Sequence, residues 1–275
     1  MRIIQMQGLF SLSWAAAFLY AVFAWRILDV LRTPVATVPR GVLYGAFLAL
    51  VLHALAVYGA VFSDSQVHFG FALALSCALL AACFVILVES AVRRVTVLTG
   101  FVLLLACPAV LVPEFFEAPV MLVAPSFAFK AHIGFALGAY GFIVDAAVQA
   151  VLLSVFSRQM KHPDRSVNAG WLSNMPDLMA MERILFRIVA CAFTCLSGVL
   201  IFGALTTREV WHVAIGFDHK TVLTWLSWLV FAVLLAGRRF LHWRGRVALC
   251  WFWVGTAILA VAYLVYRFVI EVVFS

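Results

Sequence analysis

The amino-acid sequence predicts an all-α membrane protein, a polytopic bundle of about eight transmembrane helices with both termini outside. Composition is the first reason, because 66% of the 275 residues are hydrophobic and only 11% are charged, a balance that soluble domains of this size do not have. The apolar residues also form long unbroken runs, whereas the strands of a membrane barrel alternate. Finally, basic residues concentrate in alternate connections, as expected for a multi-pass protein.

Each helix was assigned with windows of about 20 residues, the length that crosses roughly 30 Å of hydrocarbon. The predicted spans are residues 6–31, 41–63, 69–89, 94–112, 127–156, 182–205, 219–237 and 247–270. The first run is longer than a signal-peptide core, so we expect a true first span in a chain that begins at Met1. The connections are short, the longest polar stretch being 158–183, and we therefore expect a single integral membrane domain over 1–275.

The orientation of the bundle follows from the basic residues. Of the 19 Lys and Arg residues, 14 fall at the connections after spans one, three, five and seven. Such loops are typically cytoplasmic, which puts both termini outside. The opposite loops, 63–68 and 113–119, are acidic or aromatic and poor in Lys and Arg. The net charge of +7 is thus explained by topology and gives no reason to expect nucleic acid as a partner.

Several classes of chemistry lack their motifs. The chain has no G-x-S-x-G, no H-E-x-x-H and no P-loop, so we do not expect an enzyme. The six cysteines all lie inside predicted spans and form no C-x-x-C pair. This argues against a covalent haem site of the C-x-x-C-H kind and favours thiols that act as small apolar residues.

Three histidines lie inside spans or at their outer ends. His132 follows the start of span five by a little more than one turn, and His219 begins span seven from the same side, so the two should lie at similar depth. Neutral imidazoles on separate helices can ligate iron from two sides, and apolar and aromatic surroundings suit a porphyrin. Zinc or copper would want a third ligand. His53 lies near mid-depth in span two, as a hydrogen-bond partner or an alternative ligand, and pairing within the bundle is the alternative for any of the three.

We expect residues near the two outer histidines to support the same site. Asp218 would orient His219 through its second ring nitrogen, as carboxylates often do for metal-bound histidine. Other candidates are outer cations that would neutralise the propionates of a haem, and tryptophans that would wall the site: Lys220, Lys130, Arg267, Trp225 and Trp228.

Four segments of the chain resemble a known family. They are AHIGFALGAYGF (131–142), MERILFRIVACAFTCLSG (181–198), DHKTVLTWLSWLVFAVLLAGR (218–238) and HWRGRVALCWFWVG (242–255). In order and spacing they look like the transmembrane domain of the cytochrome c assembly protein family, the CcsA and HemX-like proteins, and most like a short eight-span branch of it. The resemblance covers roughly the last 150 residues.

The resemblance implies a haem-binding protein of the bacterial inner membrane that holds haem b near the outer face for handling or delivery. His132 occupies the place of the family's first outer histidine. The tryptophan-rich signature W-G-x-x-W-x-W-D is missing, since the matching stretch is REVWHVAIGFDHK, and the second outer histidine has no counterpart in RFVIEVVFS. His219 would replace that ligand. Haem and membrane lipid are the partners implied, with another membrane or periplasmic protein as a third.

Two other functions fit the same composition without haem. A small transporter would show inverted repeats and spans broken by Gly or Pro in matching halves, and we see no such repeat. A membrane subunit that regulates another membrane protein would offer its basic loops, which this chain has. Absorption spectroscopy separates haem binders from both.

Overall fold

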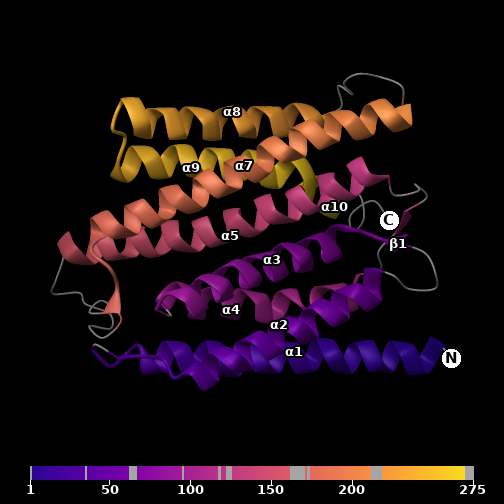
Figure 1. The fold of residues 1–275 in the computed structure, drawn as a ribbon, viewed down its shortest axis with the longest axis horizontal. Coiled ribbons are helices and arrows are strands. Elements are labelled where there is room, and N and C mark those ends of the chain that lie inside the picture. Colours follow the sequence, from indigo (N-terminus) through magenta and orange to yellow (C-terminus); the bar gives the residue numbers. More distant parts are fainter. Residues whose placement is uncertain are drawn as a thin grey trace. The chain divides into compact units, whose positions relative to one another are not determined.

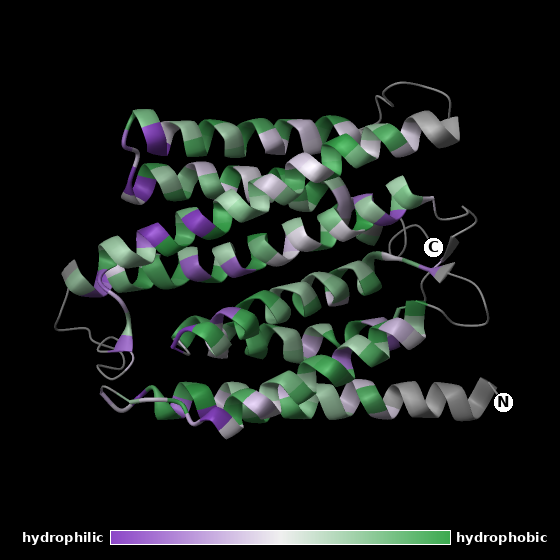
Figure 2. Ribbon diagram, viewed as in Figure 1, coloured by the Kyte–Doolittle hydropathy of each residue, from purple (hydrophilic) through white to green (hydrophobic). Residues whose placement is uncertain are grey.

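Eight helices of the computed structural model are long and apolar enough to cross a membrane, counted over the residues that the structure describes. These residues are 2–34, 36–61, 67–94, 96–116, 119–121, 126–161, 171, 174–211 and 219–269. The chain forms two compact units, Met1–Met121 with Val148–Met181, and Leu122–Ala147 with Glu182–Ser275. The helices of both units are coloured by sequence in Figure 1 and by hydropathy in Figure 2, where apolar colour runs along most of their length.

The first unit is built on four helices that pack in a closed set of pairs. They are α1 (Arg2–Val30), α2 (Arg40–Val61), α3 (Phe71–Val92) and α4 (Val97–Ala109). Helix α1 packs on α2 and α4, and α3 packs on the same two helices. Alanines with no exposed surface line these contacts, among them Ala16, Ala46 and Ala106. Small residues let membrane helices approach closely, so these apolar segments can pack tightly in a membrane, where the hydrophobic effect does not drive helices together.

Short elements follow α2 and α4. After α4 comes the 3-10 turn η2 (Val112–Glu114), which carries Pro113 in its first turn. The two-residue strands β1 (Val67–His68) and β2 (Val120–Met121) pair antiparallel. This ladder joins the connection after α2 to the connection after α4.

Polar side chains inside the first unit are paired with one another. His53 of α2 is fully buried; its Nδ1 lies 3.2 Å from Tyr20 Oη of α1 and its Nε2 lies 2.9 Å from Ser76 Oγ of α3. Ser90 and Thr99 share a second hydrogen bond at 2.9 Å between α3 and α4. Each pair satisfies groups that would otherwise be costly inside the bilayer.

The end of α1 is closed by the segment that precedes α7. Trp171 Nε1 donates to the Leu28 carbonyl at 2.7 Å, and Asn174 Nδ2 donates to the carbonyls of Leu31 and Thr33 at 2.8 Å each. The last carbonyls of a helix have no partner within it, so these side chains act as a C-terminal cap supplied from a distant part of the chain.

The second unit contains the remaining long helices. Helix α5 (Phe127–Lys161) and helix α7 (Leu178–Trp211) contribute to both units, whereas α8 (His219–Phe240) and α9 (Gly245–Ala260) belong to the second alone. Helix α9 continues as a π-turn, η4 (Val261–Val265), and the short α10 (Tyr266–Phe268). Phe231 and Phe252, both 1% exposed, fill the contact between α8 and α9.

A buried acid fastens the turn between α8 and α9 to the start of α7. Glu182 accepts the backbone N–H of Gly245 at 3.0 Å and the Arg244 Nε–H at 3.3 Å, and it lies 3.6 Å from Arg238 Nη1. The turn itself needs two residues with positive φ, His242 (54°) and Gly245 (56°). Figure 2 shows hydrophilic colour at this turn.

The prediction of eight membrane-spanning helices is confirmed, and the helix ends differ by several residues from the expected ones. Helix α4 itself ends at Ala109, just after Pro108, and the fourth apolar span continues through η2 to Glu114, where 94–112 was expected. Helices α5 and α7 are longer than the expected spans, at 35 and 34 residues. The orientation of the termini and the single domain over 1–275 stay predictions.

Candidate functional site

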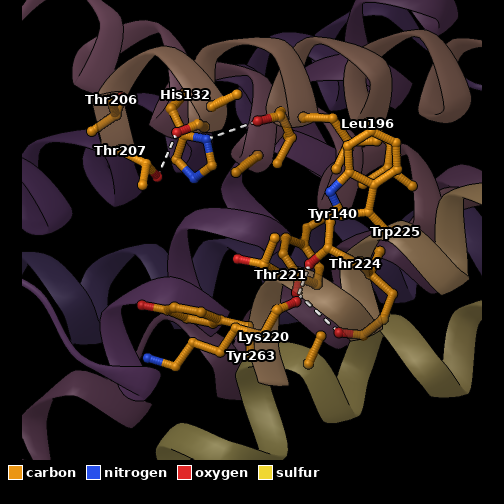
Figure 3. Close-up of a pocket in the computed structure, with 18 of the residues that line it drawn as sticks. His132, Tyr140, Leu196, Thr206, Thr207, Lys220, Thr221, Thr224, Trp225 and Tyr263 are labelled. Atoms are coloured by element: carbon orange, nitrogen blue, oxygen red, sulfur yellow. Dashed lines mark hydrogen bonds between the residues drawn. The ribbon is translucent and has the colours of Figure 1, made fainter. Parts of the chain in front are cut away.

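The second unit has a cavity of about 460 Å³ between α5, α7, α8 and the π-turn. Ordinary ligand sites occupy about 300–1,000 Å³, so this cavity is large enough for an organic ligand. The first turns of α5 and α8 and the last turns of α7 and α9 meet here, which is the end of the unit away from the α8–α9 turn. Figure 3 shows the lining side chains. They are Phe129, His132, Ala136, Ala139, Tyr140, Leu196, Val199, Leu200, Gly203, Ala204, Thr206, Thr207, Lys220, Thr221, Thr224, Trp225, Leu259, Ala262 and Tyr263.

His132 stands on the second turn of α5, lines the cavity and contacts α7. Its Nδ1 lies 3.0 Å from the carbonyl oxygen of Val199. A carbonyl can only accept, so Nδ1 carries the proton and, in a neutral ring, the lone pair resides on Nε2. Figure 3 shows this second nitrogen turned away from the carbonyl. The carbonyl therefore fixes both the tautomer and the orientation of the ring.

Three threonines of the wall donate their hydroxyl hydrogens to carbonyls of their own helices. Thr206, Thr207 and Thr224 each donate to the carbonyl four residues earlier, at 2.8, 3.0 and 2.8 Å. Their oxygens remain as acceptors. Lys220 adds a cation to the wall, with its ammonium 4.6 Å from the centre of the Tyr266 ring.

Aromatic residues hold the cavity together. The Tyr140 hydroxyl of α5 donates to the Leu259 carbonyl of α9 at 3.1 Å, just before the π-turn that brings Tyr263 to the wall. Behind His132 on α5, Phe135 stacks on Phe202 of α7 with ring centres 5.4 Å apart. The cavity is thus framed by contacts between three separate helices.

The two predicted tryptophans occupy different positions. Trp225 lines the cavity and is 46% exposed. Trp228, one turn later, points to α7, where its Nε1 donates to Ser197 Oγ at 2.9 Å and its ring stacks on Phe193. The two indoles touch edge to face at 6.3 Å. Trp225 is therefore a wall residue, and Trp228 an anchor between α8 and α7.

Some predicted site residues fall at the limit of what the structure describes. His219 is the first residue of α8 and directly precedes Lys220, but its side chain lies outside the described residues, as does that of Arg267 in α10. Asp218 lies outside them altogether. The pairing of His132 with His219 and the roles of Asp218 and Arg267 stay predictions.

His53 belongs to the first unit and is not among the residues that line this cavity. Both of its ring nitrogens lie within hydrogen-bond distance of hydroxyls. Within the described part of the chain, no group of three His, Cys, Asp or Glu residues comes together as a metal site would require. Among the described residues that line the cavity, His132 is the one imidazole.

Several contributors to the site carried no signal in the sequence. The Val199 carbonyl is a backbone group 67 residues away from His132. Tyr140 and the threonines resemble ordinary residues of a membrane helix. A clue was available at Gly138 and Gly203, since glycine inside a helix costs about 1 kcal/mol relative to alanine and implies close packing.

Comparisons with known proteins identify the family. The model of the family described as "Cytochrome C assembly protein" matches residues 41–274. The chain is 33% identical to the inner membrane protein YpjD of Escherichia coli K12 over 143 residues, which is 52% of each protein. It is 32% identical over 84 residues to the cytochrome c biogenesis protein CcsA of Trichodesmium erythraeum, covering 30% of this chain and 24% of that protein.

The match to the family model covers most of the chain, whereas the alignments to individual relatives are partial. The chain spans about half the length of the YpjD proteins that it matches. With CcsA of Triticum aestivum it is 30% identical over 60 residues, 22% of this chain and 19% of that protein. Together with the eight apolar helices, these matches make the chain a multi-pass protein of the cytoplasmic membrane, and it belongs to the cytochrome c assembly protein family.

Proposed function

We propose that this chain binds haem b in the cavity of the second unit, near the outer face of the membrane, for handling or delivery rather than for catalysis. The observation that carries the proposal is the hydrogen bond from His132 Nδ1 to the Val199 carbonyl, which leaves Nε2 as a ligand atom at an apolar cavity. The CcsA relatives are named for cytochrome c biogenesis. We infer a role for this chain in the same process.

The residues present fit the group. Aliphatic and aromatic side chains make up most of the wall, as a porphyrin face requires. Lys220 would neutralise a propionate, and bound haem would supply the iron to which His132 is directed. The Thr206 and Thr207 hydroxyls already donate to carbonyls of α7, so they have no hydrogen left to donate to a second propionate. The charged edge of the haem would therefore lie toward the beginning of α8.

His219 would supply the second ligand that holds the haem iron. Its backbone directly precedes Lys220, whose side chain lines the cavity, so the helix places the two residues on neighbouring positions of the first turn. Asp218 would accept a hydrogen bond from the ring nitrogen that does not bind iron, which favours the neutral, correctly oriented imidazole.

The outer location rests on the distribution of charge within the second unit. Its basic end joins the start of α7 to the α8–α9 turn and carries Arg183, Arg187, Arg238, Arg239, Arg244 and Arg246. The cavity lies at the other end of the same helices. Basic ends of membrane bundles are typically cytoplasmic, so the cavity would open outside.

The test is the absorption spectrum of protein produced with ample haem. We expect a low-spin spectrum with a Soret band that His132→Ala and His219→Ala each abolish or convert to high spin. His242→Asn is the matched control, because it also removes a histidine, at an exposed turn whose positive φ suits asparagine. Colourless wild-type protein, or a spectrum indifferent to His132→Ala, would refute the haem site and favour a partner subunit without haem.

A further inference from the structure

Helix α7 meets His132 at a glycine. A Cβ placed on Gly203 would lie 3.2 Å from both Cε1 and Nδ1 of the His132 ring. Apart from the backbone of α7 itself and the neighbouring residues, no other atom of the described part of the chain would come within 4 Å of this Cβ. Carbon atoms ordinarily pack at about 3.5–4.0 Å, so the ring occupies the space that any other residue at this position would fill.

The same turn of α7 supplies the acceptor. Val199 and Gly203 are four residues apart, so in an α-helix the Val199 carbonyl already receives the N–H of Gly203. A carbonyl oxygen has two lone pairs, and the second takes the Nδ1–H of His132 at 3.0 Å. The ring can reach this carbonyl only by lying against the backbone at Gly203.

Other glycines at the α5–α7 contact have different neighbours. A Cβ on Gly198 would collide with the Phe135 ring, and one on Gly138 would approach Cys195 Sγ at 3.3 Å. These two serve apolar packing between the helices. Only at Gly203, among the glycines whose surroundings are described, is the neighbour an imidazole.

We propose that Gly203 is a positioning residue for His132: its missing side chain lets the ring lie flat on α7, where the Val199 carbonyl fixes the Nδ1–H tautomer and turns Nε2 to the cavity. This assignment deepens the proposed function and rests on it for the identity of the ligand, but not for the geometry of the ring. Gly203→Ala would push the ring by a few tenths of an ångström and lengthen the hydrogen bond. A larger side chain, as in Gly203→Val, would displace it.

The geometry can be tested without haem. In ligand-free protein labelled with 15N-histidine, we expect the His132 signals, assigned by their loss in His132→Gln, to report the Nδ1–H tautomer. Gly203→Ala should shift them or mix the two tautomers, and Gly203→Val should abolish the single state. Gly134→Ala is the matched control, because it is the same substitution on α5 at a helical site with nothing within 4 Å. An Nε2–H tautomer in the wild type, or equal spectra for Gly203→Ala and Gly134→Ala, would overturn the proposal.

The second readout uses haem. Loss of an outer-shell partner typically weakens metal binding by about 10–100-fold, so Gly203→Val should retain haem at least about 10-fold less well than Gly134→Ala. If the wild type binds no haem while the 15N spectra behave as expected, the proposed function fails and the positioning role stands. If haem retention is unchanged in Gly203→Val although wild-type binding depends on His132, the positioning role fails alone.

Discussion

Replacement of His53 by leucine is the perturbation whose effect is best defined by contacts. The side chain has no exposed surface and joins three helices, through Tyr20 of α1 at 3.2 Å and Ser76 of α3 at 2.9 Å. A neutral imidazole has one donor and one acceptor nitrogen, so it can satisfy both hydroxyls at once. His53→Leu keeps an apolar side chain in place and removes both hydrogen bonds.

The magnitude follows from the two hydroxyls left behind. An unsatisfied buried polar group costs about 1–3 kcal/mol, whereas hydrogen bonds between membrane helices average only about 0.6 kcal/mol because the reference state also finds partners. Ser76 can turn its hydroxyl to a carbonyl one turn earlier on α3, which offsets part of the loss. We therefore expect His53→Leu to lower the free energy of unfolding by about 1–3 kcal/mol.

Equilibrium unfolding in detergent micelles, titrated with a denaturing detergent, measures this difference. His53→Gln is the control, since it keeps one donor and one acceptor and should recover part of the loss. The double mutant His53→Leu/Ser76→Ala should be less destabilised than the two single effects summed, because both remove the same bond. An unfolding free energy of His53→Leu equal to that of the wild type would refute this account of His53. A Soret band lost in folded His53→Leu protein would instead make His53 a ligand.

Other expectations concern an ion pair, the topology, haem retention and a helix cap. Glu182→Gln should cost about 1–3 kcal/mol of unfolding free energy, since it removes the buried anion that half-buried Arg238 and exposed Arg244 share, and unaltered stability would contradict this. Cysteines placed at Arg94 and Arg239, without the six native cysteines, should label only from the cytoplasm; outside labelling at both would reverse the topology. Lys220→Met should weaken haem retention while Lys220→Arg preserves it, and equal retention would exclude a propionate contact. Asn174→Ala should lower the unfolding free energy by about 1 kcal/mol through two lost cap bonds, as measured by detergent unfolding.

The helices could be predicted because the bilayer imposes a length and an apolar composition on each of them. Their ends could not, because the ends depend on local backbone events such as Pro108 near the end of α4 and the π-turn after α9. The start of α7 likewise follows a segment that caps α1 through Trp171. Such a contact joins residues 143 positions apart, and no local pattern announces it.

The site was predictable to the extent that depth selects residues. Position along span five singled out His132, and the start of span seven singled out Lys220 and Trp225; all three line one cavity. Depth does not specify the direction in which a side chain points: Trp228 points to Ser197 and not to the cavity. The groups that orient His132 are a backbone carbonyl and a missing side chain, neither of which has a residue type that reveals its role.

His53 and His132 illustrate why an intramembrane histidine cannot be assigned from its position alone. Both lie within apolar helices, and either would be a candidate ligand by its type. His53 has hydroxyls at both nitrogens, and a hydroxyl can donate or accept, so the ring is satisfied in either tautomer and offers no lone pair to a metal without losing a bond. His132 has a carbonyl at one nitrogen, which fixes the proton there and leaves the other for a ligand. The chemistry of each ring is therefore decided by its partner, and a search for ligands in this family should examine what each histidine's first nitrogen binds before asking what its second one faces.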